Sequence, residues 1–182
     1  VMSFFQDSFN AQSAAVRVRF GAGVRHQLAD EISRLGCRRA LILSTPPQAD
    51  SAMEIAADLK GLAAGIFTRA TMHTPVAVTE DAVAHAQSVD ADCLVSLGGG
   101  STTGLGKAIA YRTDLPQIVI PTTYAGSEMT DILGETSAGE KTTRRSPDIR
   151  PETVIYDVDL TLGLPVDLTV TSAMNAIAHA ME

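Results

Sequence analysis

The chain has 182 residues, 45% of them apolar, which is enough for a domain with a buried core and excludes a disordered protein. Its formal net charge of −7, without a basic stripe beside stacking aromatic residues, argues against a nucleic-acid partner. No stretch reaches the roughly 18 to 20 apolar residues of a membrane span. Cys37 and Cys93 are far apart and form no C-x-x-C motif, so we expect reduced thiols and a cytoplasmic location.

Short apolar runs alternate with helical patterns about every 10 to 15 residues, which is typical of β-α-β units on a parallel sheet. The expected strands are residues 16–20, 40–43, 65–68, 93–97, 117–120 and 153–156. The expected helices cover 24–35, 51–59 with Ser51 as its cap, 79–89, a segment that starts at the glycine turn and includes the periodic residues 105–111, and the region from 165 onward. The polar residues 131–145 predict a hairpin or an irregular excursion. The fold class is therefore α/β, a Rossmann-like parallel sheet flanked by helices.

Right-handed crossovers place the carboxyl ends of parallel strands at one edge of the sheet, where ligands bind. One apolar strand pattern ends at this edge in three glycines and a serine, Gly98 to Ser101, and leads into a helix. Glycine permits positive φ and a close approach to the backbone, and the free N–H groups of a helix N-terminus favour an anion. We therefore expect the pyrophosphate of a dinucleotide here.

The spacing of this glycine turn is not that of a standard nucleotide motif. The next glycine is Gly104, so the pattern departs from G-x-G-x-x-G. It is not a P-loop despite Lys107, because Ser101 stands where the first glycine of that motif belongs and Ala108 replaces its Ser/Thr. A glycine-rich turn that only packs a helix on a strand remains the alternative.

Two further loops fall at the same edge of the expected sheet. In dinucleotide folds a carboxylate at such a strand end usually binds the adenosine ribose, and here that position is the uncharged Thr45, which would not repel a 2′-phosphate. Thr45 can equally be a simple turn residue before Pro46. Residues 121–128 are rich in hydroxyl groups, which in such loops often only satisfy the local backbone.

The last helical pattern carries Asn175 and His179 one turn apart on one face, a spacing that can place two ligands on one metal ion. Asparagine is a poor ligand compared with a carboxylate, so packing or hydrogen bonding is the alternative for both residues. His26 and His85 fall on polar helix faces, where we expect them to be solvated. Residues 173–182 have no C-cap glycine or terminating proline, so we expect the chain to end within a helix.

Three motifs together resemble the N-terminal half of the iron-containing alcohol dehydrogenase superfamily: Gly98 to Ser101, Pro121 to Thr123, and Asn175 to His179. Within that superfamily, residues 72–75, 124–130 and 172–179 resemble the maleylacetate reductases. The resemblance implies an α/β nucleotide-binding domain over residues 1–164. It implies that residues 165–182 are the first helix of an all-helical second domain, whose remainder is absent from this chain, with the active site in the cleft between the domains.

The same resemblance implies an enzyme that uses NADH or NADPH to reduce the carbon–carbon double bond of maleylacetate to 3-oxoadipate in bacterial degradation of aromatic compounds. It implies a homodimer in which the helical domain completes the site. The implied catalytic residues are His179, Tyr124 and Asn175. The implied cofactor-binding residues are Thr45, His73, Gly98, Gly99, Gly100, Ser101, Thr122, Thr123 and Ser127.

Asn175 departs from the pattern of the metal-dependent members, in which an Asp and a His on this helix bind the metal. We therefore expect no metal site in this chain and no metal requirement. Reduction of a double bond next to a ketone can rely on hydrogen-bond donors to the enolate instead of a Lewis acid. Two alternatives stay open: a metal-dependent alcohol or polyol dehydrogenase of the same superfamily, and a dinucleotide-binding fragment without catalysis.

Overall fold

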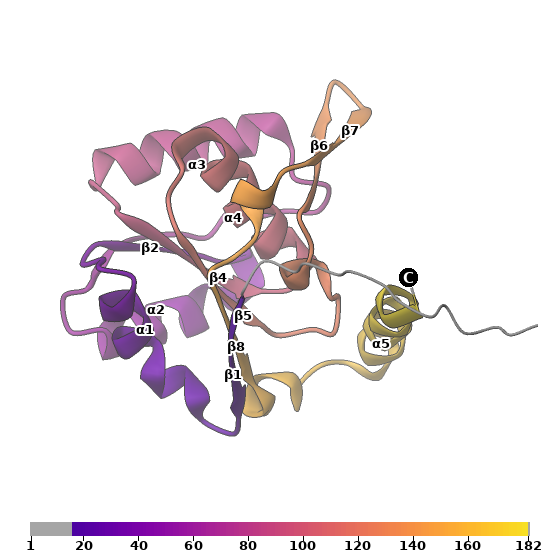
Figure 1. The fold of residues 1–182 in the computed structure, drawn as a ribbon, viewed down its shortest axis with the longest axis horizontal. Helices are drawn as coiled ribbons and strands as arrows, with labels where there is room; N and C mark the ends of the chain where they lie inside the picture. Colours follow the sequence, from indigo (N-terminus) through magenta and orange to yellow (C-terminus); the bar gives the residue numbers. More distant parts are fainter. Residues whose placement is uncertain (1–15, 182) are drawn as a thin grey trace, which may run out of the picture.

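The computed structural model describes residues 16–181, which are built on a six-stranded sheet (Figure 1). Its strands are β1 (Arg17–Gly21), β2 (Ala40–Leu43), β3 (Ala63–Phe67), β4 (Cys93–Gly98), β5 (Gln117–Pro121) and β8 (Thr153–Asp157). The order across the sheet is β1-β8-β5-β4-β2-β3, and all neighbours are parallel. The predicted α/β fold class is confirmed.

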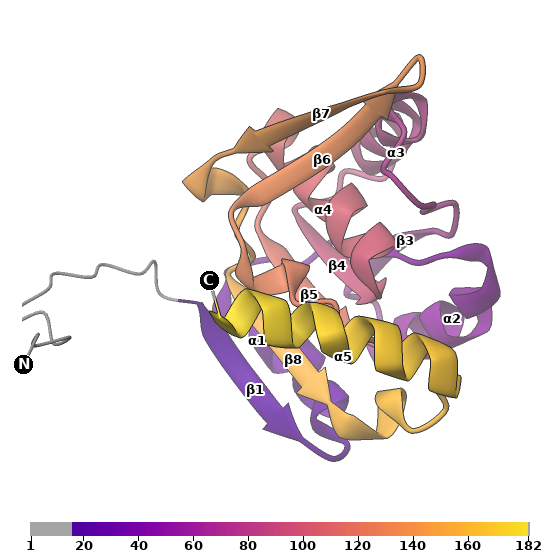
Figure 2. The same ribbon diagram turned by 90° about the vertical axis from the view of Figure 1, so that its right-hand side faces the viewer.

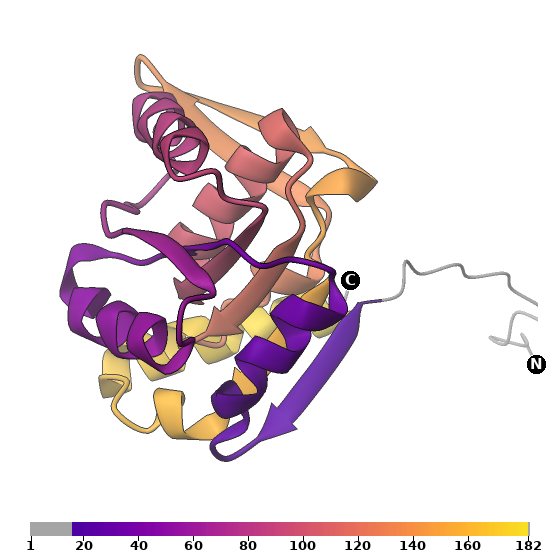
Figure 3. The same ribbon diagram turned by 90° about the vertical axis from the view of Figure 1, so that its left-hand side faces the viewer.

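Helices cover both faces of this sheet (Figures 1 and 3). They are α1 (Leu28–Arg34) and α2 (Ala49–Asp58) on one face, and α3 (Val76–Ser88) and α4 (Gly100–Thr113) on the other. Because successive strand residues point to opposite faces, Ile42 packs into the core under α1 and α2, while Leu41 and Leu43 pack under α3 and α4. Burial on both faces explains why the strands are continuous apolar runs.

Two elements lie outside this sandwich (Figure 2). An antiparallel hairpin of β6 (Ile132–Ser137) and β7 (Glu140–Arg145) packs against α3 and α4, so the hairpin alternative for residues 131–145 is correct. Its turn residues Ala138 and Gly139 both have positive φ, 49° and 82°, as a two-residue hairpin turn requires. The last helix, α5 (Val166–Met181), lies beside the carboxyl edge of the sheet. Within residues 16–181, no helix has both the length and the apolar character needed to cross a bilayer.

Two local predictions are wrong, those for Ser51 and His85. Ser51 is not a helix cap, because the 3-10 turn Pro46–Gln48 starts the helix earlier and α2 begins at Ala49; proline fixes φ at a helical value. As expected, the helix starts at the glycine turn: it begins at Gly100, so Gly99 alone separates it from β4. His85 is not fully solvated but partly buried: its ring packs 6.0 Å from that of Phe67, and its Nε2 is buried.

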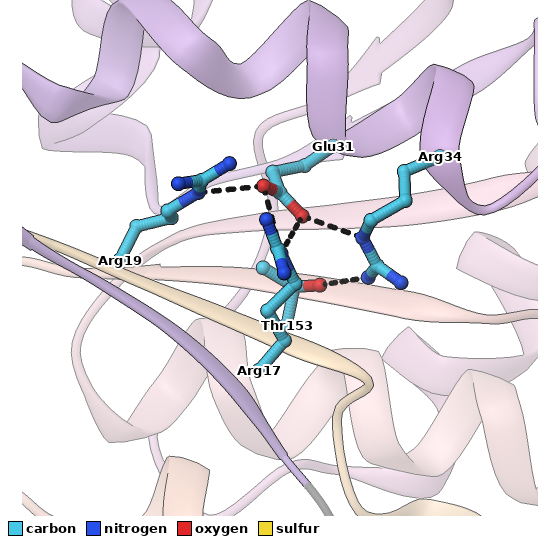
Figure 4. Close-up of polar contacts among 5 residues, drawn as sticks. All are labelled: Arg17, Arg19, Glu31, Arg34 and Thr153. Carbon is cyan, nitrogen blue, oxygen red and sulfur yellow. Dashed lines mark hydrogen bonds and ion pairs between the residues drawn. The ribbon is translucent and has the colours of Figure 1, made fainter.

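A buried carboxylate fastens the edge strand β1 to α1 (Figure 4). Glu31 is 1% exposed and accepts hydrogen bonds from Arg17 at 2.9 Å, Arg19 at 2.7 Å and Arg34 at 2.8 Å. Arg34 also donates to Thr153 Oγ1 on β8 at 2.7 Å. Burial alone would raise the pKa of Glu31, but the three guanidinium groups outweigh it and lower this pKa to about 2.

We expect Glu31→Gln to reduce the free energy of unfolding by about 1 to 3 kcal/mol, because it leaves three arginines facing a neutral amide; their partial exposure limits the loss. A carboxyl group with a depressed folded-state pKa stabilises above its ordinary value near 4.5 and loses that contribution as the pH falls through about 2. Urea titrations across this window should therefore show the difference from the wild type vanish near pH 2. The exposed Glu54 on α2 supplies the control, Glu54→Gln, which should change little at any pH.

Candidate functional site

The loops that follow β2, β4 and β5 meet at the carboxyl edge of the sheet, and Gln48 joins them. Gln48 Nε2 donates to Thr122 Oγ1 at 2.9 Å, and Thr45 Oγ1 donates to Gln48 Oε1 at 3.1 Å. The Thr122 N–H donates to the carbonyl oxygen of Gly98 at 3.0 Å. The sequence does not single out Gln48, because one glutamine after two prolines carries no motif. Thr45 is thus next to the predicted site, but its hydroxyl is already hydrogen-bonded within the protein.

The glycines of the turn are required for different reasons. Gly98 has φ +143°, and a Cβ there would lie 2.6 Å from both Gln48 Oε1 and Thr102 Oγ1. Gly99 has an ordinary φ of −91°, but its Cβ would lie 2.9 Å from Thr123 Oγ1. Gly100 has nothing closer than 4.0 Å. The strained backbone is therefore at Gly98, and close packing is the constraint at Gly99.

The N-terminus of α4 faces a cavity of about 360 Å³, which we call the glycine-turn cavity. Its lining includes Gly100, Ser101, His73, Thr123 and Asn175, so five of the predicted site residues come together from four separate segments. No side chain caps the first turn of α4, and none of the residues lining the cavity is Asp or Glu. Free N–H groups, the positive end of the helix dipole and neutral hydrogen-bonding groups together favour an anionic ligand.

His73 reaches this cavity from a backbone conformation that non-glycine residues rarely adopt. His73 and Thr74 both have positive φ, 65° and 44°, and Thr74 is 5% exposed. The Thr74 carbonyl accepts a hydrogen bond from the Thr136 N–H at 3.2 Å, and Pro75 forms a β-bridge with Thr136. The β6–β7 hairpin therefore holds the turn that presents His73, a long-range role that the local sequence did not reveal.

Tyr124 lines a different cavity of about 700 Å³, which we call the tyrosine cavity. Thr123 lines both cavities and so lies between them. In the tyrosine cavity, Tyr156 donates to Glu128 Oε1 at 2.9 Å, and Glu128 is 4% exposed. Burial, with a smaller contribution from Glu128, raises the pKa of the Tyr156 phenol above its usual range, so this hydroxyl stays a donor at neutral pH.

The Ser127 hydroxyl lies close to the N-terminus of α4. Its Oγ is buried, has no hydrogen-bond partner among the described residues, and lies 4.0 Å from the position that a Cβ on Gly100 would occupy. A buried hydroxyl without a partner costs free energy, and a ligand atom at the helix N-terminus could provide one. Ser127 is thus the predicted residue whose surroundings most directly call for a ligand.

The described donors that line the glycine-turn cavity differ from those of a typical Fe²⁺ or Zn²⁺ site. Asn175 lines the glycine-turn cavity, where the only other strong donor is the His73 imidazole, and no carboxylate lines it. Fe²⁺ and Zn²⁺ sites are built from imidazole and anionic ligands, so this donor set does not fit. His179 lies in α5, but its side chain is outside the described part of the chain.

One cluster of possible metal ligands lies at the opposite, amino-terminal edge of the sheet. In residues 16–181 it comprises Cys37, Asp92 and Cys93, whose ligand atoms lie within 4.8 Å of one another, although the sequence separates the two thiols. Burial raises the pKa of both thiols, and Asp92 already accepts backbone N–H bonds from Arg38 at 2.7 Å and Arg39 at 2.8 Å. These groups favour neutral, reduced thiols and not metal binding.

A parallel sheet with a glycine turn and an uncapped helix N-terminus at its carboxyl edge defines a dinucleotide-binding type of domain. Residues 15–158 match the sequence model of the iron-containing alcohol dehydrogenases, and the chain belongs to that family.

Several proteins with similar sequences or structures are maleylacetate reductases. The chain is 62% identical to a maleylacetate reductase of Rhizobium sp. strain MTP-10005 over 93% of its own length and 48% of the relative. It is 56% identical to a maleylacetate reductase of Sphingobium indicum, over 91% of this chain and 47% of the relative. The crystal structure of maleylacetate reductase from Agrobacterium tumefaciens superimposes with a TM-score of 0.94 at 59% identity, covering 96% of this chain and 50% of the other. The chain thus spans about half the length of these relatives.

We expect Gly99→Val to weaken NADH binding about tenfold or more, because a branched side chain at this position meets Thr123 and fills the approach to the α4 N-terminus. The sheet should remain folded, since Gly99 has an ordinary φ. Fluorescence titration with NADH measures the affinity, and thermal unfolding checks the fold. An unchanged affinity would place the phosphates elsewhere.

Proposed function

We propose that the complete protein reduces the carbon–carbon double bond of maleylacetate to 3-oxoadipate in the degradation of aromatic compounds, with NADH or NADPH as reductant. The high identity to maleylacetate reductases across nearly this whole chain carries the proposal. The anion-favouring glycine-turn cavity supports it, because both a dinucleotide and a substrate with two carboxylates need such an environment.

The proposed cofactor-binding residues divide by location. Gly98 and Gly99 allow the pyrophosphate to approach the backbone, and the free N–H groups of Gly100 and Ser101 receive it. Thr45 and Thr122, linked by Gln48, would lie on the adenosine side. His73, Thr123 and Ser127 would border the nicotinamide side, where the unpartnered Ser127 hydroxyl offers a hydrogen bond.

A dihydronicotinamide held by these residues would supply the hydride that reduces the alkene carbon β to the ketone. The electron pair of the double bond then moves onto the ketone oxygen as an enolate, and a proton at the other alkene carbon completes the reduction. The amide of Asn175, the hydroxyl of Tyr124 and the imidazole of His179 are the proposed donors that orient the substrate and stabilise the enolate. We propose that they do so without a metal ion, because no carboxylate lines the glycine-turn cavity in which Asn175 lies.

We further propose that residues 1–164 form the nucleotide-binding domain and residues 165–182 the first helix of a helical domain. The apolar side chains on α5 support this division: Val166, Leu168, Val170, Met174 and Ile177 are all more than half exposed. We also propose a cytoplasmic homodimer. The edge strand β1, which exposes Val18 and Phe20, is a surface that pairing could cover.

We expect both NADH and NADPH to bind with similar affinity, because Thr45 and Gln48 present no negative charge to a 2′-phosphate. Thr45→Asp should then weaken NADPH binding about tenfold relative to NADH through charge repulsion. Parallel fluorescence titrations with the two cofactors test this. A wild-type protein that already rejects NADPH by orders of magnitude would show that another residue selects the cofactor.

The complete protein should oxidise NADH in the presence of maleylacetate, at the same rate before and after exhaustive chelation. Chelation that abolishes the rate, with recovery on adding Fe²⁺ or Zn²⁺, would instead favour the metal-dependent alcohol or polyol dehydrogenase. NADH binding without turnover would favour the non-catalytic alternative. As a further check, Asn175→Asp should raise KM, since it adds a negative charge where a dianion binds.

A further inference from the structure

Lys107 is an unusual residue because its side chain is almost completely buried. It lies in the second turn of α4, is 1% exposed, and is among the largest fully buried side chains of residues 16–181. Lysine is rarely buried unless its charge is paired and hydrogen-bonded. In the sequence, Lys107 stands out only as a possible P-loop lysine, and the chain does not form that motif. A P-loop therefore does not explain why Lys107 is buried.

The ammonium group of Lys107 binds one short segment of the chain, residues 127–132. Its Nζ donates to the carbonyl oxygens of Ser127 at 2.5 Å, Thr130 at 2.7 Å and Ile132 at 3.0 Å, and to Thr130 Oγ1 at 3.0 Å. The segment contains the 3-10 turn Ser127–Met129 and the first residue of β6. A single charged group therefore fixes the backbone that connects the loop after β5 to the hairpin.

Charged groups from the same 127–132 segment and from Arg150 lie around this ammonium. Glu128 and Asp131 lie near it with negative charge, and Arg150, which pairs with Asp131 at 3.9 Å, adds positive charge. Tyr156 on β8 faces Glu128 as a neutral phenol. Burial outweighs the two carboxylates and lowers the pKa of Lys107 to about 8. Its contacts are thus made by a charged group at neutral pH and by a neutral amine above pH 8.

These contacts join the two halves of the proposed cofactor site. The first turn of α4 carries Gly100 and Ser101, while the segment fixed by Lys107 begins at Ser127, whose hydroxyl lies beside Gly100. We infer that Lys107 is a positioning residue for the dinucleotide, because its ammonium holds residues 127–132 against α4 and so sets the Ser127 hydroxyl at the helix N-terminus. This inference rests on the proposed use of NADH or NADPH.

The test measures NADH affinity in the complete protein with Lys107→Met, which keeps much of the length of the side chain but removes the charge and the donors. We expect an increase in Kd of about tenfold, the effect of losing a charge-assisted hydrogen bond. Adding Ser127→Ala to Lys107→Met should increase Kd little further, because the lysine acts through that hydroxyl. Lys60→Met, at an exposed lysine after α2, is the matched control and should bind NADH normally.

A pH titration gives a readout that general destabilisation would not produce. Wild-type affinity for NADH should fall as the pH rises through about 8, because the neutral amine no longer donates to all the carbonyl groups. This slope should be absent from Lys107→Met. If that variant does not fold, the slope is instead compared between the wild type and Ser127→Ala, which should flatten it.

The outcomes separate this inference from the proposed function. Wild-type protein that binds NADH, together with a Lys107→Met variant of unchanged affinity, overturns only the inference. Additive losses in the double variant, or a pH profile that is flat through pH 8 in the wild type, also overturn it. Protein that binds neither NADH nor NADPH contradicts the proposed function itself. Because binding is measured without substrate, the identity of the substrate does not affect the result.

Discussion

The close packing around the turn between β4 and α4 is the constraint on which the site depends. Gly98 has a positive φ. Gln48, from the loop after β2, packs close to Gly98, and Thr123, from the loop after β5, packs close to Gly99. The same packing excludes a side chain at Gly99 and leaves the first N–H groups of α4 facing a cavity. The anion-favouring end of the helix is therefore set by the packing of the protein before any ligand is present.

Glu31 and Lys107 are two of the most deeply buried charged side chains in the described part of the chain, and their surroundings differ. Glu31 is surrounded by three arginines, which keep it charged down to about pH 2, and it connects the edge strand to α1 far from the glycine turn. Lys107 is bound mainly by neutral carbonyl oxygens, so burial brings its pKa to about 8. Glu31 therefore keeps its charge and its ion pairs at physiological pH, whereas Lys107 can lose its charge near that pH.

Most elements of the fold followed from the sequence because both sheet faces are covered, which makes buried strands such as 40–43 short apolar runs. The glycine turn and the convergence of His73, Ser101 and Asn175 were also predictable, from strand ends and from the family resemblance. Gln48 and Lys107 were not, since a polar side chain reveals its partners only after distant loops have packed around it. The positive φ at Thr74 likewise depends on a hairpin about 60 residues later.

Because the chain has a negative net charge, anion binding depends on the groups that line the glycine-turn cavity. A net charge of −7 repels phosphates and carboxylates at long range, but counterions screen this repulsion beyond about 10 Å. Within that distance, the glycine-turn cavity presents a helix N-terminus, an imidazole, hydroxyls and an amide, and no residue lining it carries a negative charge. Asn175 contributes a neutral amide to this lining, where an aspartate would add a negative charge. The absence of negative charge among the residues that line the cavity, together with the helix N-terminus, favours an anionic ligand there.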